Sequence, residues 1–212
     1  MPNRDVPLLR VLLAFLIATF LLITGFLIGY GVSFYQYQDV ALQQESIRYD
    51  LLSIDLQGQM VDSCERVILS GISSELDEMG SRIGILEERL GKNHENVLDQ
   101  KGRYTLLEVQ HFLNIKEYNK ECGENINTIL FFYSNSDDFK EGAGRIGFIL
   151  SNIKRKDISN IMVYSFDYNL DTQMIKVLKE IYGITSPNTI VINEEHNIVE
   201  VGSADDVEKH LV

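Results

Sequence analysis

Two cysteines, Cys64 and Cys122, are the residues of this chain whose possible chemistry is easiest to name. A thiol pair can form a stable disulfide, or exchange disulfides when one thiol is held as a reactive thiolate. On a helical hairpin whose connector occupies residues 91–102, Cys122 faces about residue 71, which lies roughly 10 Å from Cys64 at helical rise. Bonding would then need a bend near Gly71. A structural disulfide, two free thiols and a redox-active pair are all open alternatives.

Two polar patterns partly match metal sites. Glu108 and His111 form an E-x-x-H pair on one helical face, but a di-iron bundle needs a second such pair, which the sequence lacks. We therefore expect both side chains at a helix surface. The run that begins at Asp167 matches the start of a calcium loop, but Thr172 replaces the required glycine and Leu178 the terminal glutamate. The sequence predicts no metal site, no cofactor and no catalytic residue.

An uncharged apolar run occupies residues 11–35. At about 1.5 Å per residue it extends roughly 37 Å, enough to cross a hydrocarbon core of about 30 Å. Arg4 and Arg10 precede the run, whereas Asp39 and Glu45 are the first charged residues after it. This asymmetry predicts a cytoplasmic N-terminus and an extracytoplasmic remainder. A cleaved signal peptide is the alternative, but its apolar region usually has only about 7 to 15 residues.

The remainder of the chain is acidic. Removing Arg4, Arg10 and Asp5 from the 19 basic and 31 acidic residues leaves 17 and 30, a net charge of −13. Such a surface disfavours nucleic acid and anionic lipid as partners. No pattern identifies a small-molecule substrate. We expect residues 11–35 to contact the membrane. We also expect the region on the outer side to bind a protein partner or to self-associate.

Helical periodicity dominates the segment from 36 to 122. Apolar residues recur at intervals of three, four or seven from Val40 to Leu90, which predicts an amphipathic helix with a coiled-coil-like seam. Gly71 marks a plausible helix break, and one long kinked helix and two shorter helices are both open alternatives. Residues 91–102 are bounded by glycines and predict a connector before a second helix at 104–121. The segment is thus a hairpin or coiled-coil spacer, with a plain stalk as the alternative.

From residue 123 onward, the helical spacing of apolar residues gives way to short apolar runs that are typical of strands. The pattern predicts strands at 127–134, 160–166, 189–193 and 197–201, and helices at 144–154, 171–182 and 203–212. We expect Asp171 near the cap of the second of these helices and Ser203 as the cap of the third. Strand, helix, strand indicates a parallel βαβ unit, and the last two strands indicate an antiparallel hairpin. The predicted fold class is α/β behind a transmembrane helix and a helical spacer.

Three stretches, ILFFYSN, MVYSFDYN and YGITSPNTIVIN, occur in an order that resembles the thioredoxin superfamily over residues 127–212. The resemblance implies a thioredoxin-like domain at 123–212, in which the first strand leads into a Cys-x-x-Cys motif. The N-terminus of the following helix lowers the thiol pKa in that motif. Here Ser136, Asp137, Asp138 and Phe139 occupy the place. No thiolate can form there, so we do not expect an enzyme of this kind.

The same family places a cis-proline opposite its reactive motif. Pro187 matches by position, although Asn188 separates it from Thr189, whereas the family usually puts the proline next to the threonine. The resemblance therefore implies a cis Ser186–Pro187 bond. It also implies a groove between Pro187 and residues 136–139 that could bind an extended chain.

Three functions follow as hypotheses. The first is a membrane-anchored, extracytoplasmic binding or scaffold module without a reactive Cys-x-x-Cys. The second is a thiol–disulfide oxidoreductase or redox partner that uses Cys64 and Cys122. The third is a purely structural protein that oligomerises through the apolar seam.

Overall fold

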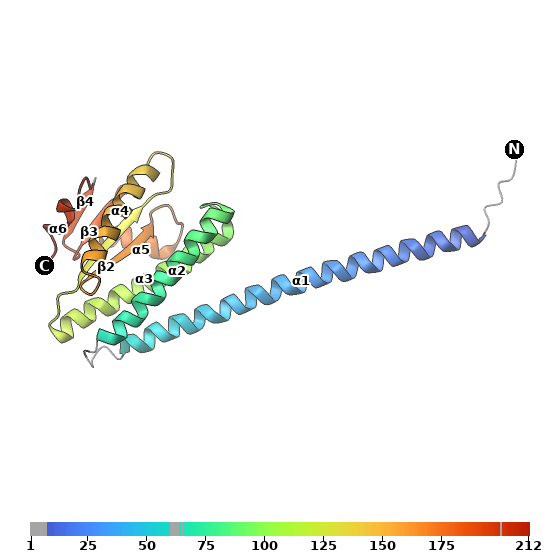
Figure 1. Cartoon of the computed structure of the whole chain (residues 1–212), viewed down its shortest axis with the longest axis horizontal. Coiled ribbons are helices and arrows are strands. Elements are labelled where there is room, and N and C mark those ends of the chain that lie inside the picture. Colours follow the sequence, from blue (N-terminus) through green and yellow to red (C-terminus); the bar gives the residue numbers. More distant parts are fainter. Residues whose placement is uncertain (1–7, 60–63, 65, 200) are drawn as a thin grey trace. The chain divides into compact units, whose positions relative to one another are not determined.

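The structure is a computed structural model that describes the backbone of residues 8–59, 64, 66–199 and 201–212. Side chains at 32–51, 54, 55, 57–59 and 66–70 lie outside the description. The chain divides into two compact units, residues 1–50 and 51–212, which are described separately. The elements, which Figure 1 labels except for β1, are α1 (Leu8–Gln59), α2 (Arg66–Leu90), α3 (Glu95–Cys122), β1 (Asn127–Tyr133), α4 (Lys140–Lys156), β2 (Ile161–Asp167), α5 (Gln173–Ile181), β3 (Thr189–Ile192), β4 (His196–Val199) and α6 (Asp205–Glu208).

Within α1, the segment Leu8–Gly31 is long and apolar enough to cross a membrane. Its large apolar side chains are exposed, which suits a lipid environment. The hydroxyls of Thr19 and Thr24 donate to the carbonyls of Phe15 and Phe20, each at 2.9 Å, so these polar groups are satisfied inside the helix. The first part of the predicted apolar seam, from Val40, has side chains outside the described residues.

The four strands form one mixed sheet in the order β2-β1-β3-β4. β1 pairs with β2 in parallel, from Asn127 opposite Ile161 to Tyr133 opposite Asp167. β3 pairs antiparallel with both β1 and β4. The predicted parallel βαβ unit and antiparallel hairpin are therefore both present, and the mixed α/β class is confirmed.

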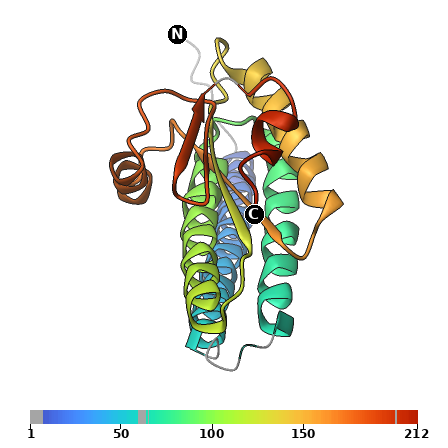
Figure 2. The same ribbon diagram turned by 90° about the vertical axis from the view of Figure 1, so that its left-hand side faces the viewer.

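Helices cover both faces of this sheet. Because β1 is central, alternate side chains enter different cores, with Ile129 and Phe131 on one face and Leu130 and Phe132 on the other. The first face packs against α4 and α6, and the second against α3 and α5. Figure 2 shows α4 and α3 on opposite sides of the strands. Burial on both faces explains why NTILFFY reads as a continuous apolar run.

The α2–α3 hairpin differs from its prediction in two ways. α2 runs unbroken through Gly71, so the expected helix break there is wrong. α3 begins at Glu95 with His94 as its cap, and the connector shrinks to residues 91–94, where Gly91 takes a φ of 91°. Gly102, read as the connector's end, instead lies inside α3, where a Cβ would be 3.6 Å from Thr172 Cγ2. That distance is an ordinary van der Waals contact, so packing does not require a glycine at this position.

The prediction that Asp171 lies near a helix cap is confirmed, whereas the predicted cap at Ser203 is wrong by one residue. Thr172, not Asp171, caps α5 by accepting a hydrogen bond from the Ile175 amide. Ala204, not Ser203, occupies the cap position of α6, and Ser203 instead donates to the Asp206 carboxylate. α6 therefore begins without the side-chain cap that Ser203 was expected to supply.

Candidate functional site

The loop at 136–139 leaves β1 and enters α4. All four side chains are exposed, Phe139 by 38 %. The Ser136 carbonyl accepts hydrogen bonds from the amides of Phe139 and Lys140 at 3.0 and 2.9 Å, which starts the helix. Lys140 lies 2.7 Å from Asp137 and lowers the pKa of that carboxyl. The loop thus presents an aromatic ring and two carboxylates, and no sulfur.

The turn that contains Pro187 contacts this loop. Asn188 Nδ2 donates to the Phe139 carbonyl at 2.9 Å, and the Asn188 amide donates to the Phe132 carbonyl at 2.7 Å. The Ser186–Pro187 bond is trans, so the cis bond implied by the resemblance is wrong. Asn188 takes a φ of 61° and turns the chain into β3. The inserted asparagine, which the sequence showed only as a mismatch, is the residue that ties the two segments together.

Cys64 and Cys122 form a disulfide, with Sγ atoms 2.01 Å apart and Cα atoms 5.6 Å apart. The predicted separation of roughly 10 Å assumed a connector centred too far along the chain. Residue 93 lies halfway between the two cysteines and falls inside the observed connector, so they face each other without a bend at Gly71. No free cysteine is left in the chain.

Glu108 and His111 are buried, with 2 % and 1 % exposure, so the expectation of a helix surface is wrong. α3 lies between α2 and β2, and this face of it points into the interface. Glu108 Oε1 accepts from the Ser165 amide of β2 at 2.8 Å. His111 Nδ1 lies 3.0 Å from the Tyr164 hydroxyl. Among the described residues, no group of three or more His, Cys, Asp or Glu side chains is placed to hold a metal ion.

Glu108 is a buried acid with one unsatisfied oxygen, because Oε2 has no hydrogen-bond partner. Burial raises the pKa of this carboxyl well above its usual range, while the Ser165 amide and Lys154 oppose the shift. The folded protein therefore holds the Glu108 proton more tightly than the unfolded chain does. This group favours folding below its unfolded pKa, and that contribution is lost as the pH rises through the folded pKa.

We expect Glu108→Gln to stabilise the region 51–212 on the order of 1 kcal/mol or more at pH 8, and much less at pH 4. Glutamine keeps the acceptor for the Ser165 amide and cannot ionise. Urea unfolding across this pH range measures the difference. Glu117→Gln, at an exposed position of the same helix, is the matched control and should leave the profile unchanged. An equal gain at both pH values would contradict this account.

A second buried cluster lies at the carboxyl ends of β1 and β2. Lys101, 4 % exposed, places its Nζ 2.6 Å from Glu87 Oε1 and 2.9 Å from Asp167 Oδ2. Asn135 Nδ2 donates to the same Asp167 oxygen at 3.2 Å, which links the cluster to the residue just before Ser136. No sequence pattern indicates this cluster, because its members come from α2, α3, β2 and the loop after β1 and do not recur at a regular interval along the chain.

Comparison of the chain with protein-family models gave no match, and comparison with the curated proteins gave none either.

Proposed function

We propose that this chain is a membrane-anchored binding or scaffold module, in which a thioredoxin-like domain without a reactive Cys-x-x-Cys binds a protein partner outside the membrane. The single observation that carries this proposal is the loop at 136–139. It stands where the family has its thiols, it is exposed, and its Phe139 carbonyl is tied to Asn188 beside Pro187.

The sheet supports the thioredoxin-like part of the proposal. A parallel βαβ unit precedes an antiparallel hairpin, with helices on both faces, in the order that the resemblance requires. The segment at 136–139 occupies the junction of the first strand and the next helix, which is the family's place for reactive thiols. The match therefore rests on topology and position together.

The disulfide supports the outer location. Cys64 and Cys122 form a disulfide bond. Disulfide bonds persist in oxidising compartments and are rare in the cytosol. This agrees with the positive residues that precede the apolar segment of α1. With the N-terminus in the cytoplasm, the region after the membrane lies where such a bond survives.

The charge and shape of the loop favour binding over catalysis. Asp137 and Asp138 add negative charge at the start of α4, and such charge is stabilised by the helix dipole. Phe139 supplies exposed apolar area beside them. An exposed aromatic ring flanked by carboxylates suits a partner segment that is apolar with adjacent basic residues.

Site-specific photo-crosslinking tests the proposal. We expect p-benzoylphenylalanine placed at Phe139 of the full chain, in its native membrane, to give a discrete crosslinked protein band. Phe148 is the matched control, because it is also an exposed phenylalanine of the same region, at 68 % exposure on α4. A discrete band from 139 and none from 148 supports the proposal. Equal labelling from both positions, or no band from 139, would count against it.

A further inference from the structure

A cavity of about 300 Å³ lies beside the buried ion cluster and is lined by α2, α3 and the carboxyl ends of β1 and β2. Glu87, Lys101 and Asp167 supply its charges, and Tyr104 and Tyr133 supply aromatic walls. We propose that this cavity binds a small organic cation that carries a primary ammonium group. The inference does not depend on the proposed function, since the loop at 136–139 does not line the cavity.

The charge balance of the cavity selects a cation. Two carboxylates face a single ammonium, which leaves one negative charge in a partly buried space. Asp167 is further held by Asn135 Nδ2 and the Asn169 amide, whereas Lys101 is the only charged partner recorded for Glu87 among the described residues. In a low-dielectric setting an uncompensated charge attracts a counter-charge strongly. Anionic ligands are disfavoured for the same reason.

Two hydroxyls in the cavity wall have no hydrogen-bond partner in the part of the chain that the structure describes. Neither the Tyr104 nor the Tyr133 hydroxyl makes a hydrogen bond to any residue that the structure describes, although both rings are largely enclosed. A phenolic oxygen can accept a hydrogen bond from an ammonium group, and the ring faces attract cations. Lys101 Nζ already lies 5.6 Å from the Tyr133 ring centroid. The aromatic walls of the cavity therefore favour a cation, in addition to its net negative charge.

Small residues of α2 make room for the ligand. A Cβ at Gly80 would lie 3.1 Å from the Tyr104 hydroxyl, so a larger residue there would push this ring a few tenths of an ångström away from α2. A Cβ at Gly84 would meet nothing within 4 Å. The volume is at the lower end of ligand pockets, which limits the ligand to a few non-hydrogen atoms beyond its ammonium.

Three four-carbon probes test the proposal on the full chain in phosphatidylcholine nanodiscs, whose zwitterionic lipid does not itself attract cations. They are putrescine, butane-1,4-diol and succinate. Titration calorimetry should show saturable putrescine binding at least about tenfold tighter than the diol, and no succinate binding. Equal binding of putrescine and the diol, or any binding of succinate, would overturn the proposal.

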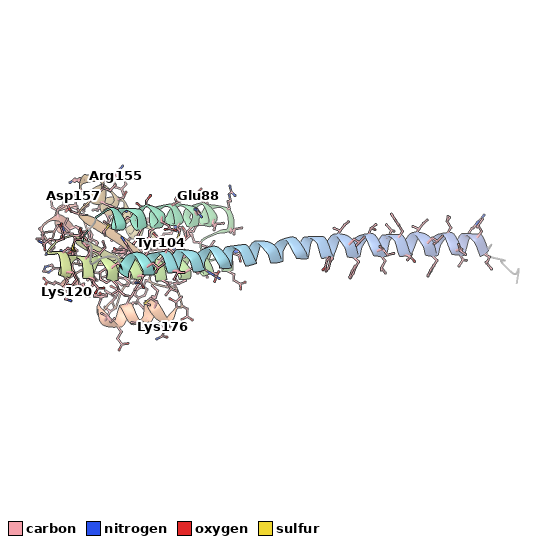
Figure 3. The ribbon with its side chains drawn as sticks, turned by 90° about the horizontal axis from the view of Figure 1, so that it is seen from below. Glu88, Tyr104, Lys120, Arg155, Asp157 and Lys176 are labelled. Carbon is pink, nitrogen blue, oxygen red and sulfur yellow. A yellow bond between two sulfur atoms is a disulfide. The ribbon has the colours of Figure 1, made fainter. Side chains whose placement is uncertain are left out.

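Neighbouring glutamates of α2 give a matched pair of variants. Glu87→Gln should weaken putrescine binding by about tenfold or more, whereas Glu88→Gln, at an exposed position labelled in Figure 3, should leave it unchanged. Equal losses in both would indicate attraction to the acidic surface and reject the site. If Glu87→Gln fails to fold, Gly84→Leu decides, because a Cβ at this position meets nothing within 4 Å and the rest of the side chain adds bulk at the cavity wall. Unchanged binding in that variant would also reject the site.

Discussion

Replacement of Lys101 by alanine is expected to destabilise the region 51–212 by about 3 to 5 kcal/mol. The Lys101 ammonium is almost fully buried and is the shared partner of the Glu87 and Asp167 carboxylates. Its removal leaves two carboxylates close together without the charge that compensates them, and buried charges that lose a partner are costly. Urea unfolding monitored by circular dichroism gives the change in the free energy of unfolding.

Two comparisons separate the loss of charge from the loss of side-chain volume. Lys116→Ala removes an exposed lysine of the same helix that pairs with Glu194, and should cost only about 0 to 1 kcal/mol. A triple variant, Lys101→Met with Glu87→Gln and Asp167→Asn, removes all the charges and should recover most of the stability that Lys101→Ala loses. A small effect of Lys101→Ala, similar to that of Lys116→Ala, would show that the cluster is hydrated and not buried.

Loss of the disulfide should have an effect of similar size. The bond joins residues 58 apart in sequence, and the chain-entropy treatment gives about 4 kcal/mol for a loop of this length. We expect Cys122→Ser to destabilise the region by that order, and Cys64→Ser to do the same. The double variant should match the single ones, because either substitution alone removes the bond. Thermal unfolding of the wild type, oxidised and reduced, provides the reference.

Comparing the single variants with the double variant separates the effect of an unpaired thiol from the effect of the missing bond. If the single variants are far less stable than the double one, an unpaired thiol, and not the missing bond, causes the loss. If none of the three differs from the wild type, the α2–α3 hairpin is held by its side chains alone, through the cluster of Ile72, Leu76 and Leu107.

The spacing of apolar residues and the content of branched and aromatic residues predicted the strands well. Because β1 is buried on both faces, its run of apolar residues gave a clear signal, and its observed bounds differ from the prediction by one residue. The β3–β4 hairpin was likewise marked by its turn residues. Helix ends were harder, since capping depends on which of two adjacent polar residues reaches the free amides, as at Asp171 and Thr172.

The α2–α3 hairpin could not be predicted in detail. Gly102 looked like a loop residue, but it lies inside α3, where glycine is an unfavourable but tolerated residue. Because the connector was predicted too long, the residue expected to face Cys122 was residue 71, whereas Cys64 faces it in the structure. The buried positions of Lys101, Glu108 and His111 were also hidden, because polar residues on a helix normally indicate solvent. Only the packing of α3 between α2 and β2 reverses this expectation.

The binding role of residues 136–139 and Pro187 stays a prediction. The sequence identified residues 136–139 and Pro187 through the resemblance, and the structure brings the two segments together through a residue the family pattern lacks, Asn188. The ion cluster and its cavity were not foreseen, since they assemble from four separate elements. Asn135 connects the two regions, because it precedes Ser136 and its amide group donates to Asp167.

A non-reducing peptide mass map of protein taken from its native membrane tests the central claim most directly, namely that the chain holds a domain without available thiols on the outer side of a membrane. Thiols are blocked by an alkylating reagent at the moment of lysis. We predict that Cys64 and Cys122 are recovered almost entirely as one linked peptide pair, with no alkylated cysteine. Substantial alkylation of either residue, or mixed disulfides with other proteins, would contradict the account and favour a thiol-exchanging role.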